Sequence, residues 1–598
     1  MTHYPLSFGA ELVEKGVRFR FWAPDAADVS VVIDGDPPQA MQAEGGGWFS
    51  LVTDKARPGS RYRYRIGDAL YPDPTSRSQP EAALGPSGVI DPGAYRWEDA
   101  GWRGIPWEKA VIYELHPGAF SESGDFAGIA ERLDYLASLG ITLIEIMPVA
   151  ETPGRWNWGY DGVLPFAPAR RYGGPDQLKR LVDACHRHGI GVILDVVYNH
   201  FGPEGNFLHA YASAFFNEAR KTPWGAAINF DGAEGRAVRD FFIENALYWL
   251  KEFHLDGLRL DAVHAIEDRS AVPILVELGQ RVREAFPDRP IHLTLENDKN
   301  EPSLLGYGKG GPGLYDAQWN DDFHHALHVL LTGAKGGYYE DYSDDPVGWL
   351  GRVLAEGFAY QGESSGHRGG QPRGGKSASL PPTAFINFLQ NHDQVGNHAY
   401  GWRLPKFATP EALRAGAALL LLTPGLPLLF MGEEWASDAP FPFFCDFEGE
   451  LADAVRNGRL EEFGSFPEFR DPEARAAIPD PLAEATFLSA KLDWAAAKKP
   501  GHREMLALYR ELIALRQRHI APLLAHAKGP DGRFVKLGKT ALEVRWRLSG
   551  RELRLVANLG PEPVPVRMEP SGQVIFQSHP AVDPLPPWFV GVDLAGAR

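Results

Sequence analysis

Residues that can do chemistry cluster in a few short segments, and each segment follows a run of strand-forming residues. In the segment from Gly257 to His264, Arg259 and Asp261 stand two positions apart, so they project to the same side of a strand. Charges inside a sheet are unfavourable unless they pair and face a cavity. This segment alone fits a structural ion pair as well as it fits a reactive site.

Other segments place further polar groups after strand-like runs. An isolated Asp at the end of a strand is usually a turn or a helix cap. The repetition of acids and imidazoles at so many strand ends favours one shared site instead. Its candidate members are His116, Tyr160, Asp195, His200, Arg259, Asp261, His264, Glu296, Asn297, Asp298, His392, Asp393 and Gln394.

Three converging acids, without a cysteine cluster or a recognisable metal cage, suit hydrolysis of a glycosidic bond. One carboxylate attacks the anomeric carbon and one carboxylic acid protonates the leaving oxygen. A third charge stabilises the oxocarbenium-like transition state and raises the pKa of the acid by like-charge repulsion. An arginine beside the nucleophile keeps it ionised, imidazoles can hydrogen-bond sugar hydroxyls, and an aromatic such as Tyr160 can stack on a sugar ring.

Strand-like and helix-like patterns alternate between about residues 110 and 520. Eight strands with intervening helices predict an α/β fold built on a closed (β/α)8 barrel, with an open doubly wound sheet as the alternative. In such a barrel the catalytic groups lie at the C-terminal ends of the strands. The expected strands are 111–116, 141–148, 191–200, 257–261, 291–297, 316–320, 385–393 and 426–433, and the expected helices are 129–139, 177–188, 238–253, 274–286 and 502–518.

Short strands with alternating polarity flank the predicted barrel on both sides. Residues 17–22, 29–33, 48–52 and 62–66 are typical of a small N-terminal β-sandwich. From about residue 534 the chain returns to short strands, which predicts a C-terminal β-domain. We therefore expect three domains, over residues 1–105, 106–525 and 526–598.

The Gly- and Ser-rich stretch 362–379 is expected to be a mobile loop. Within it, residues 370–377 match the phosphate-binding P-loop pattern letter by letter. That motif requires a buried strand before it and a helix after it, and this sequence supplies neither. We therefore reject nucleotide binding.

Composition excludes several classes of protein. The formal net charge of −18 argues against binding to nucleic acid or to anionic membranes. Two cysteines, Cys185 and Cys445, exclude a disulfide framework and a cysteine-rich zinc site. The N-terminal residues lack an apolar segment of signal-peptide length, and no apolar run approaches the roughly 18 residues of a membrane span. We expect a cytoplasmic protein that needs no metal and no cofactor; the sequence does not indicate an oligomeric state.

The segments DVVYNH, GLRLDAVH, LEND and QNHDQ resemble, in order and spacing, the four signature regions of the α-amylase superfamily. The resemblance covers nearly the whole chain, and the segment at 16–33 is similar to the starch-binding-like module that precedes such barrels. It implies Asp261 as nucleophile, Glu296 as general acid/base and Asp393 as stabiliser of the transition state. It also implies that the cleaved sugar is surrounded by Arg259, His200, His392 and Tyr160, with Asp195 as a structural member and His264 on the leaving-group side.

Within the superfamily, the chain is most similar to the trehalohydrolases that act on maltooligosyltrehalose. The features are VIYELHPGAFS at the first strand, Glu-Asn-Asp at the acid, QNHDQVGNHAYGWRL after the seventh strand and PFFCDFEGELADAVRNGRLEEF after the eighth. The resemblance implies an α-glucan substrate whose α-1,4 bond next to a terminal trehalose unit is hydrolysed with retention. The alternatives are a glucan branching enzyme, a debranching enzyme and a catalytically inactive glucan-binding protein.

Overall fold

The centre of the molecule is a closed barrel of eight parallel strands. The computed structural model describes residues 3–305, 313–464, 471–525, 527, 529, 531–580 and 583–596. The last barrel strand pairs with the first, which closes the sheet. The predicted (β/α)8 barrel is thereby confirmed and the open sheet excluded. In barrel order the strands are β10 (Ile112–Leu115), β11 (Leu143–Ile146), β14 (Gly191–Val196), β17 (Gly257–Leu260), β18 (His292–Leu295), β19 (Ala317–Trp319), β20 (Phe385–Phe388) and β21 (Leu426–Phe430).

The barrel strands end earlier than the sequence patterns predict. Strand β14 ends at Val196 rather than at residue 200, and β20 ends at Phe388 rather than at residue 393. The polar residues that follow leave the sheet and form capped turns, because their side chains bond to nearby backbone groups. In the clearest case the residues after β20 form the short helix α10 (His392–Gly396). These turns, rather than the strands, carry most of the candidate side chains.

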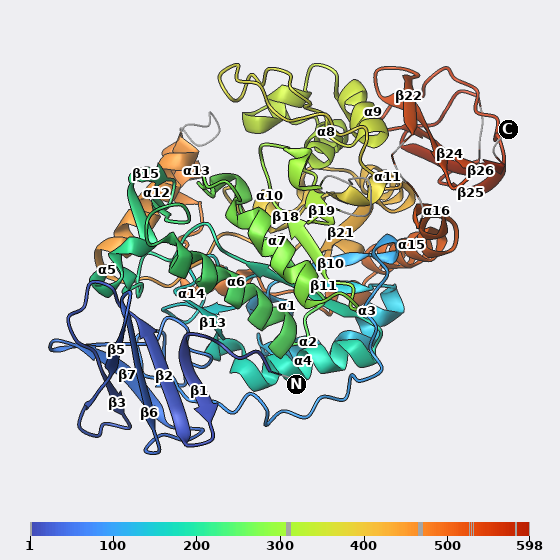
Figure 1. The fold of residues 1–598 in the computed structure, drawn as a ribbon. Helices are drawn as coiled ribbons and strands as arrows, with labels where there is room; N and C mark the ends of the chain where they lie inside the picture. The colour runs from blue at the N-terminus through green and yellow to red at the C-terminus, as the bar shows by residue number, and fades with distance from the viewer. Residues whose placement is uncertain are drawn as a thin grey trace.

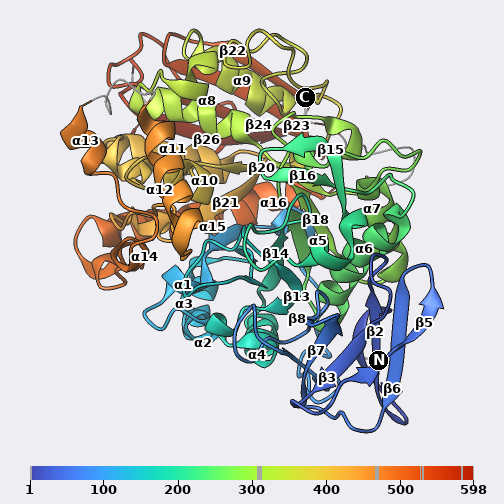
Figure 2. The same cartoon turned by 90° about the vertical axis from the view of Figure 1, so that its left-hand side faces the viewer.

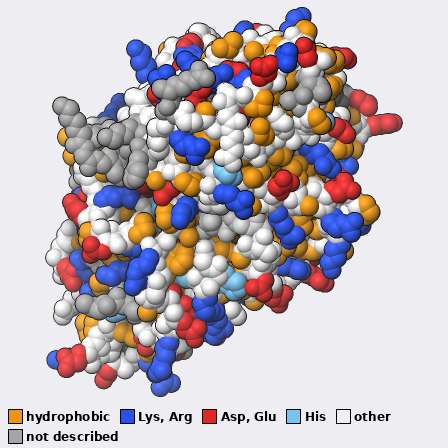
Figure 3. Space-filling model, turned by 90° about the vertical axis from the view of Figure 1, so that its right-hand side faces the viewer, with side chains coloured by type: hydrophobic (Ala, Val, Ile, Leu, Met, Phe, Trp, Pro, Cys, Tyr) orange, Lys and Arg blue, Asp and Glu red, His pale blue; other side chains and the backbone are white. Residues whose placement is uncertain are grey.

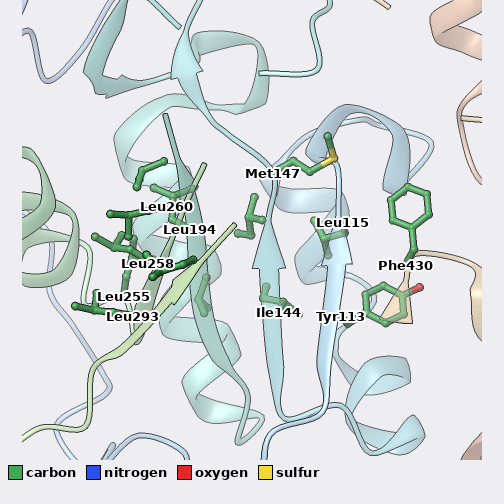
Figure 4. Close-up of a cluster of buried hydrophobic side chains, with 14 of the residues drawn as sticks. Tyr113, Leu115, Ile144, Met147, Leu194, Leu255, Leu258, Leu260, Leu293 and Phe430 are labelled. Atoms are coloured by element: carbon green, nitrogen blue, oxygen red, sulfur yellow. The ribbon is translucent and has the colours of Figure 1, made fainter. Parts of the chain in front are cut away.

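Side chains on the barrel strands alternate between two environments, as the two-residue period of a strand requires. One set joins the large core that also contains residues of the surrounding helices, and includes Tyr113, Leu115, Ile144, Leu194 and Leu258 (Figure 4). The other set fills the barrel interior as a separate apolar cluster of Ala110, Ile112, Leu143, Ile193, Ala317, Trp319, Ile386, Phe388, Leu426 and Leu428.

Helices surround the barrel, and most lie within a few residues of their predicted positions. The prediction of one helix over 129–139 is wrong, because the chain breaks there into α2 (Phe126–Ala130) and α3 (Leu133–Leu139). In the described part of the chain, no helix combines the length and the apolar composition that crossing a membrane requires. The other long helices around the barrel are α4 (Gly174–Arg187), α6 (Gly235–Glu252), α7 (Ile274–Ala285), α8 (Asp321–Thr332), α9 (Pro346–Glu356), α11 (Pro410–Leu422) and α15 (His502–Leu515).

The N-terminal residues form the predicted β-sandwich. Aromatic pairs join its two sheets: Phe21 stacks on Tyr64 at 4.1 Å between ring centroids, and Phe19 meets Tyr62 at 4.8 Å. The first sheet contains β1 (Gly9–Val13), β2 (Gly16–Trp22), β5 (Gln42–Gly45) and β6 (Trp48–Thr53). The second contains β3 (Ser30–Ile33), β4 (Gln39–Ala40), β7 (Arg61–Ile66), β8 (Ala69–Tyr71) and β9 (Ser87–Gly88).

The C-terminal residues form one antiparallel sheet that packs on the barrel helices. The Trp546 indole donates to the carbonyl of Leu354 in α9 at 2.7 Å. Figures 1 and 2 show this sheet and the N-terminal sandwich at opposite ends of the molecule. The boundaries proposed between the three domains stay a prediction. The strands are β22 (Gly532–Lys536), β23 (Ala541–Leu548), β24 (Arg551–Asn558), β25 (Gln573–Gln577) and β26 (Phe589–Gly596).

The stretch 362–379 is anchored, in contrast to the mobile loop expected from its composition. The Arg373 side chain is buried and donates to Asp322 at 2.7 Å and to the Tyr342 hydroxyl at 2.6 Å. The backbone nitrogens of Gly374 and Gly375 donate to the turn after β18. Position 374 requires glycine, because a Cβ there would lie 1.9 Å from the backbone oxygen of Tyr360 and because the residue has a φ of +82°. No helix follows residues 370–377, so this part of the chain is not a P-loop.

The visible surface carries charges of both signs. On the face shown in Figure 3, the described lysine and arginine side chains are scattered among aspartates and glutamates. A nucleic-acid-binding face requires clustered positive charge instead. The exclusion of nucleic-acid binding drawn from the net charge stays a prediction. The expected cytoplasmic location stays a prediction.

Candidate active site

One guanidinium group, that of Arg259, joins three acids at the C-terminal end of the barrel. Its Nη1 donates to Asp195 Oδ2 at 2.7 Å and to Asp261 Oδ1 at 2.8 Å, and its Nη2 donates to Glu296 Oε2 at 3.0 Å. Arg259 is fully buried and lies 4.1 Å from the ring centroid of Trp319. The Arg259 and Asp261 side chains meet on one side as predicted, although β17 ends at Leu260 and Asp261 directly follows the strand. Of the other two acids, Asp195 lies on the adjacent strand β14, and Glu296 directly follows the adjacent strand β18.

The oxygens of Glu296 and Asp261 are held differently, and the difference matters for chemistry. Glu296 Oε2 accepts from Arg259 and also from the backbone nitrogen of Ala262 at 2.8 Å. Both contacts fall on Oε2, so Oε1 is the oxygen available to carry a proton towards a substrate. Asp261 is held at both oxygens, because the Asn199 amide donates to Oδ2 at 2.7 Å while Arg259 donates to Oδ1.

The turn after β20, which carries Asp393, is held by hydrogen bonds between its own residues. The Asn391 side chain accepts from the backbone nitrogens of Asp393 and Gln394, and the Gln394 side chain accepts from the backbone of Asn391. This is a capping box. From β10, which is separated from β20 by β21 in the barrel, Glu114 accepts from the His392 backbone at 3.0 Å and from its ring Nδ1 at 2.5 Å. His392 Nε2 lies 3.4 Å from Asp393 Oδ1.

Aromatic and imidazole groups form one wall of the site. The Tyr160 hydroxyl donates to Asp195 at 2.7 Å, and its ring lies 5.1 Å from that of His392 in a stacked arrangement. His200 Nε2 bonds the Tyr160 carbonyl at 3.0 Å. Trp224 lies in the connection between β15 (Phe216–Thr222) and β16 (Gly225–Ile228) and stacks on His200 at 4.6 Å. The flat faces of this wall suit contact with sugar rings.

The electrostatics of the site separate the two carboxyl roles. Burial raises the pKa of Glu296 well above its usual range, and the nearby Asp261 and Asp393 charges raise it further. The sequence argument named only the like charges, which are the smaller cause. Burial also acts to raise the pKa of Asp393, but the adjacent His392 and Arg259 cations hold it below the ordinary value. A protonated Glu296 near an ionised Asp393 is the arrangement that a general acid needs.

Two residues that were predicted to contact the substrate, His116 and Gln394, instead hydrogen-bond to neighbouring parts of the protein. His116 is almost fully buried, and its Nε2 donates to the carbonyl of Asn157 at 2.9 Å in the loop that carries Tyr160. Burial lowers the pKa of His116 to about 3, so this ring is neutral. Gln394 serves the capping box through its side-chain oxygen. Both residues therefore position neighbours in this structure.

The turn after β18 places the remaining predicted residues beside Glu296. Asn297 is buried and its side chain accepts from the backbone of Lys299 at 3.1 Å. Asp298 forms an ion pair with Arg368 from the anchored stretch 362–379. His264 Nδ1 accepts from the Asp298 backbone at 3.3 Å. Asn297 braces the turn, whereas His264 and Asp298 lie partly exposed at its surface.

Three neighbours of the site were missed as members by sequence reasoning. Glu114 stands in the otherwise apolar segment VIYEL, and a lone acid in a buried strand is a signal that was available. Asn199 stands in the segment DVVYNH, and its amide donates to the backbone and side chain of Asp261. Trp224 had no sequence signal, because its hairpin reaches the site only through the fold. In the described residues no group of three or more His, Cys, Asp or Glu side chains is arranged to hold a metal ion.

A large cavity of about 690 Å³ opens beside the turn that carries Asp393. Its volume is in the range of small-molecule binding sites. Trp402 is 40% exposed and Tyr338 is 36% exposed, so their rings are available for contact with a ligand. The lining includes Gln394, Asn397, Tyr338, Tyr339, Trp402 and Phe407.

Three families of known domains match this chain. Residues 70–246 match "Alpha amylase, catalytic domain", residues 7–74 match "Carbohydrate-binding module 48 (Isoamylase N-terminal domain)", and residues 531–592 match a C-terminal domain of unknown function. The amylase match falls mainly on the first part of the barrel, the carbohydrate-binding match on the N-terminal sandwich, and the third match on the C-terminal sheet.

Curated relatives match over most of the chain. A malto-oligosyltrehalose trehalohydrolase from Saccharolobus solfataricus is 40% identical, over 86% of this chain and 87% of that protein. One from Mycobacterium tuberculosis is 40% identical, over 94% of this chain and 95% of its own length. A crystal structure from Salmonella typhimurium, titled as an alpha amylase, superposes with a TM-score of 0.95 at 46% identity, covering 99% of this chain and all of the other.

Proposed function

This chain belongs to the malto-oligosyltrehalose trehalohydrolase family of α-amylase-type glycoside hydrolases, and from that premise we propose that Asp261, Glu296 and Asp393 carry its reaction. The substrate is a maltooligosyltrehalose, and the bond cleaved is the α-1,4 bond next to the terminal trehalose. The observation that carries the proposed roles is the position of Arg259, which holds Asp261 and Glu296 on adjacent nitrogens of one guanidinium.

In the first step Asp261 attacks the anomeric carbon while Glu296 gives its proton to the glycosidic oxygen. The bond between that carbon and oxygen breaks, trehalose leaves, and the glucan stays bound to Asp261 as a glycosyl ester. Arg259 orients Asp261 by donating to its Oδ1 at 2.8 Å, and burial keeps Glu296 protonated. Asp393, the most exposed of the three acids with 38% of its side chain exposed, stabilises the positive charge that develops on the sugar.

In the second step Glu296, now ionised, takes a proton from water. The water oxygen attacks the anomeric carbon, the ester bond to Asp261 breaks, and the shortened maltooligosaccharide is released with its original anomeric configuration. Two displacements on opposite faces give net retention. An inverting enzyme needs a wider gap between its carboxyl groups to admit the water, and a single guanidinium that bridges Asp261 and Glu296 favours the shorter separation.

The cavity beside Asp393 supplies room for sugar residues next to the reacting one. Exposed rings at Trp402 and Tyr338 offer flat apolar surfaces on which sugar rings can stack. If the cavity binds the glucan chain, a Trp402→Ala variant should raise KM for long substrates and spare the shortest one. An equal effect at every chain length would remove the cavity from this role.

Product analysis tests the proposed function directly. Maltooligosyltrehalose, a maltooligosaccharide of the same length and amylopectin are incubated with the wild-type enzyme and with Asp261→Asn. We expect trehalose and a shortened maltooligosaccharide from the first substrate, at a kcat/KM about 10³-fold above that for the plain chain, and no turnover by the variant. Equal kcat/KM on the first two substrates would identify a general α-glucan hydrolase, and new branch points in amylopectin would identify a branching enzyme.

A further inference from the structure

Two buried glutamates stand side by side in the barrel, below the catalytic turn. Glu114 on β10 and Glu145 on β11 are direct partners in the parallel strand register, and each is only 1% exposed. Two neighbouring carboxyl groups in a low-dielectric interior cannot both be ionised at low cost. One of them must therefore carry a proton unless a cation compensates it.

The surroundings of the two glutamates differ. Glu114 accepts two hydrogen bonds from His392, one on each carboxyl oxygen. Neither carboxyl oxygen of Glu145 has a hydrogen-bond partner among the described residues. An ionised carboxylate without any partner is unfavourable by several kcal/mol in such a site. Glu145 is therefore the neutral member of the pair, and burial raises its pKa accordingly.

The ring of His392 lies between two carboxylates. Its Nδ1 is 2.5 Å from Glu114 Oε1, and its Nε2 is 3.4 Å from Asp393 Oδ1. A neutral imidazole has one N–H and one lone pair, so one of these contacts would set a lone pair against a carboxylate. Only the imidazolium presents an N–H to both. Among the described residues, Glu145 and His116, which are neutral, also interact with His392, and the Tyr160 ring stacks on it.

We propose that Glu114 is a positioning residue of the catalytic site, whose buried negative charge keeps His392 doubly protonated so that Nε2 donates towards Asp393 and the bound sugar. The inference rests on the proposed function for the role of Asp393. Glu114 also fixes the backbone of the same turn through the His392 nitrogen. Its action reaches the substrate through His392, and Glu114 itself does not touch the reacting atoms.

A matched pair of isosteric variants tests the proposal. Glu114→Gln removes the charge below His392, whereas Glu145→Gln replaces a group that is already neutral at the same barrel level. The pKa of His392 is measured by NMR on histidine-labelled enzyme, with the resonance assigned through His392→Asn. We expect a doubly protonated ring at pH 7 in the wild type, a pKa lowered by about 1–3 units in Glu114→Gln, and no comparable shift in Glu145→Gln.

Kinetics provide the functional readout. For Glu114→Gln the loss in kcat/KM should be at least tenfold larger at pH 8 than at pH 5, because the ring still protonates at the lower pH. Glu145→Gln should change kcat/KM by a small factor that does not depend on pH. A purely structural defect would give a pH-independent loss for both variants.

Several results overturn the proposal. These are a neutral His392 ring in the wild type at pH 7, equal effects of the two variants, or a larger shift in Glu145→Gln. If Glu114→Gln does not fold, a neutral His392 ring in the wild type at pH 7 still overturns the proposal. A neutral ring in an enzyme that still needs Asp261 would reject this inference alone, whereas wild-type turnover by Asp261→Asn would reject the proposed function.

Discussion

Replacing Glu296 by glutamine isolates the proton-transfer step from the rest of the site. Glu296 Oε2 accepts from the Ala262 backbone at 2.8 Å and from Arg259 at 3.0 Å. In Glu296→Gln both donors fix the amide oxygen at this place, so the NH2 group occupies the position of Oε1. The variant keeps the shape and the neutral charge of the protonated acid, and loses only the proton that it transfers.

The size of the loss follows from this geometry. General acid catalysis contributes about 10²–10⁴-fold to rate, which corresponds to roughly 3–5 kcal/mol in the activation free energy. We expect that loss in kcat on maltooligosyltrehalose, whose leaving oxygen needs protonation. On α-maltosyl fluoride, whose fluoride leaves without a proton, the formation of the glycosyl ester should slow by less than about tenfold. The thermal midpoint should change little, because a neutral group replaces a neutral group.

The assay compares single-turnover rates of wild type and variant on the two substrates, with the thermal midpoint as the control for folding. An equal loss on both substrates in a well-folded variant would show that Glu296 acts on something other than the leaving group. Turnover of maltooligosyltrehalose by Glu296→Gln at the wild-type rate would show that Glu296 is not the general acid.

Three further outcomes follow from the structure. The reducing end newly formed from maltooligosyltrehalose should appear first as the α-anomer in a fast NMR time course; initial β-anomer would contradict the two-step mechanism. Arg259→Lys should lower kcat/KM by about 10–100-fold, because at least one charge-assisted hydrogen bond of about 1.5–3 kcal/mol is lost, and unchanged kinetics would show that the guanidinium is not needed. At the base of the barrel, both ring nitrogens of His186 lie 2.9 Å from carboxylates, those of Asp99 and Asp256; burial opposes the charged ring, but the two carboxylates outweigh it and raise the pKa of His186. This stabilisation is fully present below about pH 6.5 and is lost as pH rises through the raised pKa of His186 in the folded state. The difference in thermal midpoint between wild type and His186→Gln should therefore shrink from pH 6 to pH 9. A difference that stays constant over this range would contradict the argument.

The amino-acid sequence by itself determined the architecture and the reactive groups. Hydrophobic periodicity is a local property, so the alternation of strands and helices was readable along the chain and predicted the barrel. Arg259 lies on β17 and Asp261 directly follows its last residue, so their shared direction was predictable from the two-residue strand period. The convergence of Glu296 and Asp393 with them follows from barrel closure, because all eight C-terminal strand ends meet at one face.

Only the tertiary structure decided which polar side chains face a substrate and which brace the site. Gln394 and Asn297 bond to their own turns, and His116 is buried under a loop; nothing in their residue types separates these roles from substrate contact. The contact between Glu114 and His392 spans 278 positions of the chain. Such contacts depend on strand register, on closure of the barrel and on the rotamers that neighbouring side chains permit, and local pattern contains none of these. The sequence therefore identified the chemistry, whereas the protonation state of the groups that perform it is set by through-space burial and pairing.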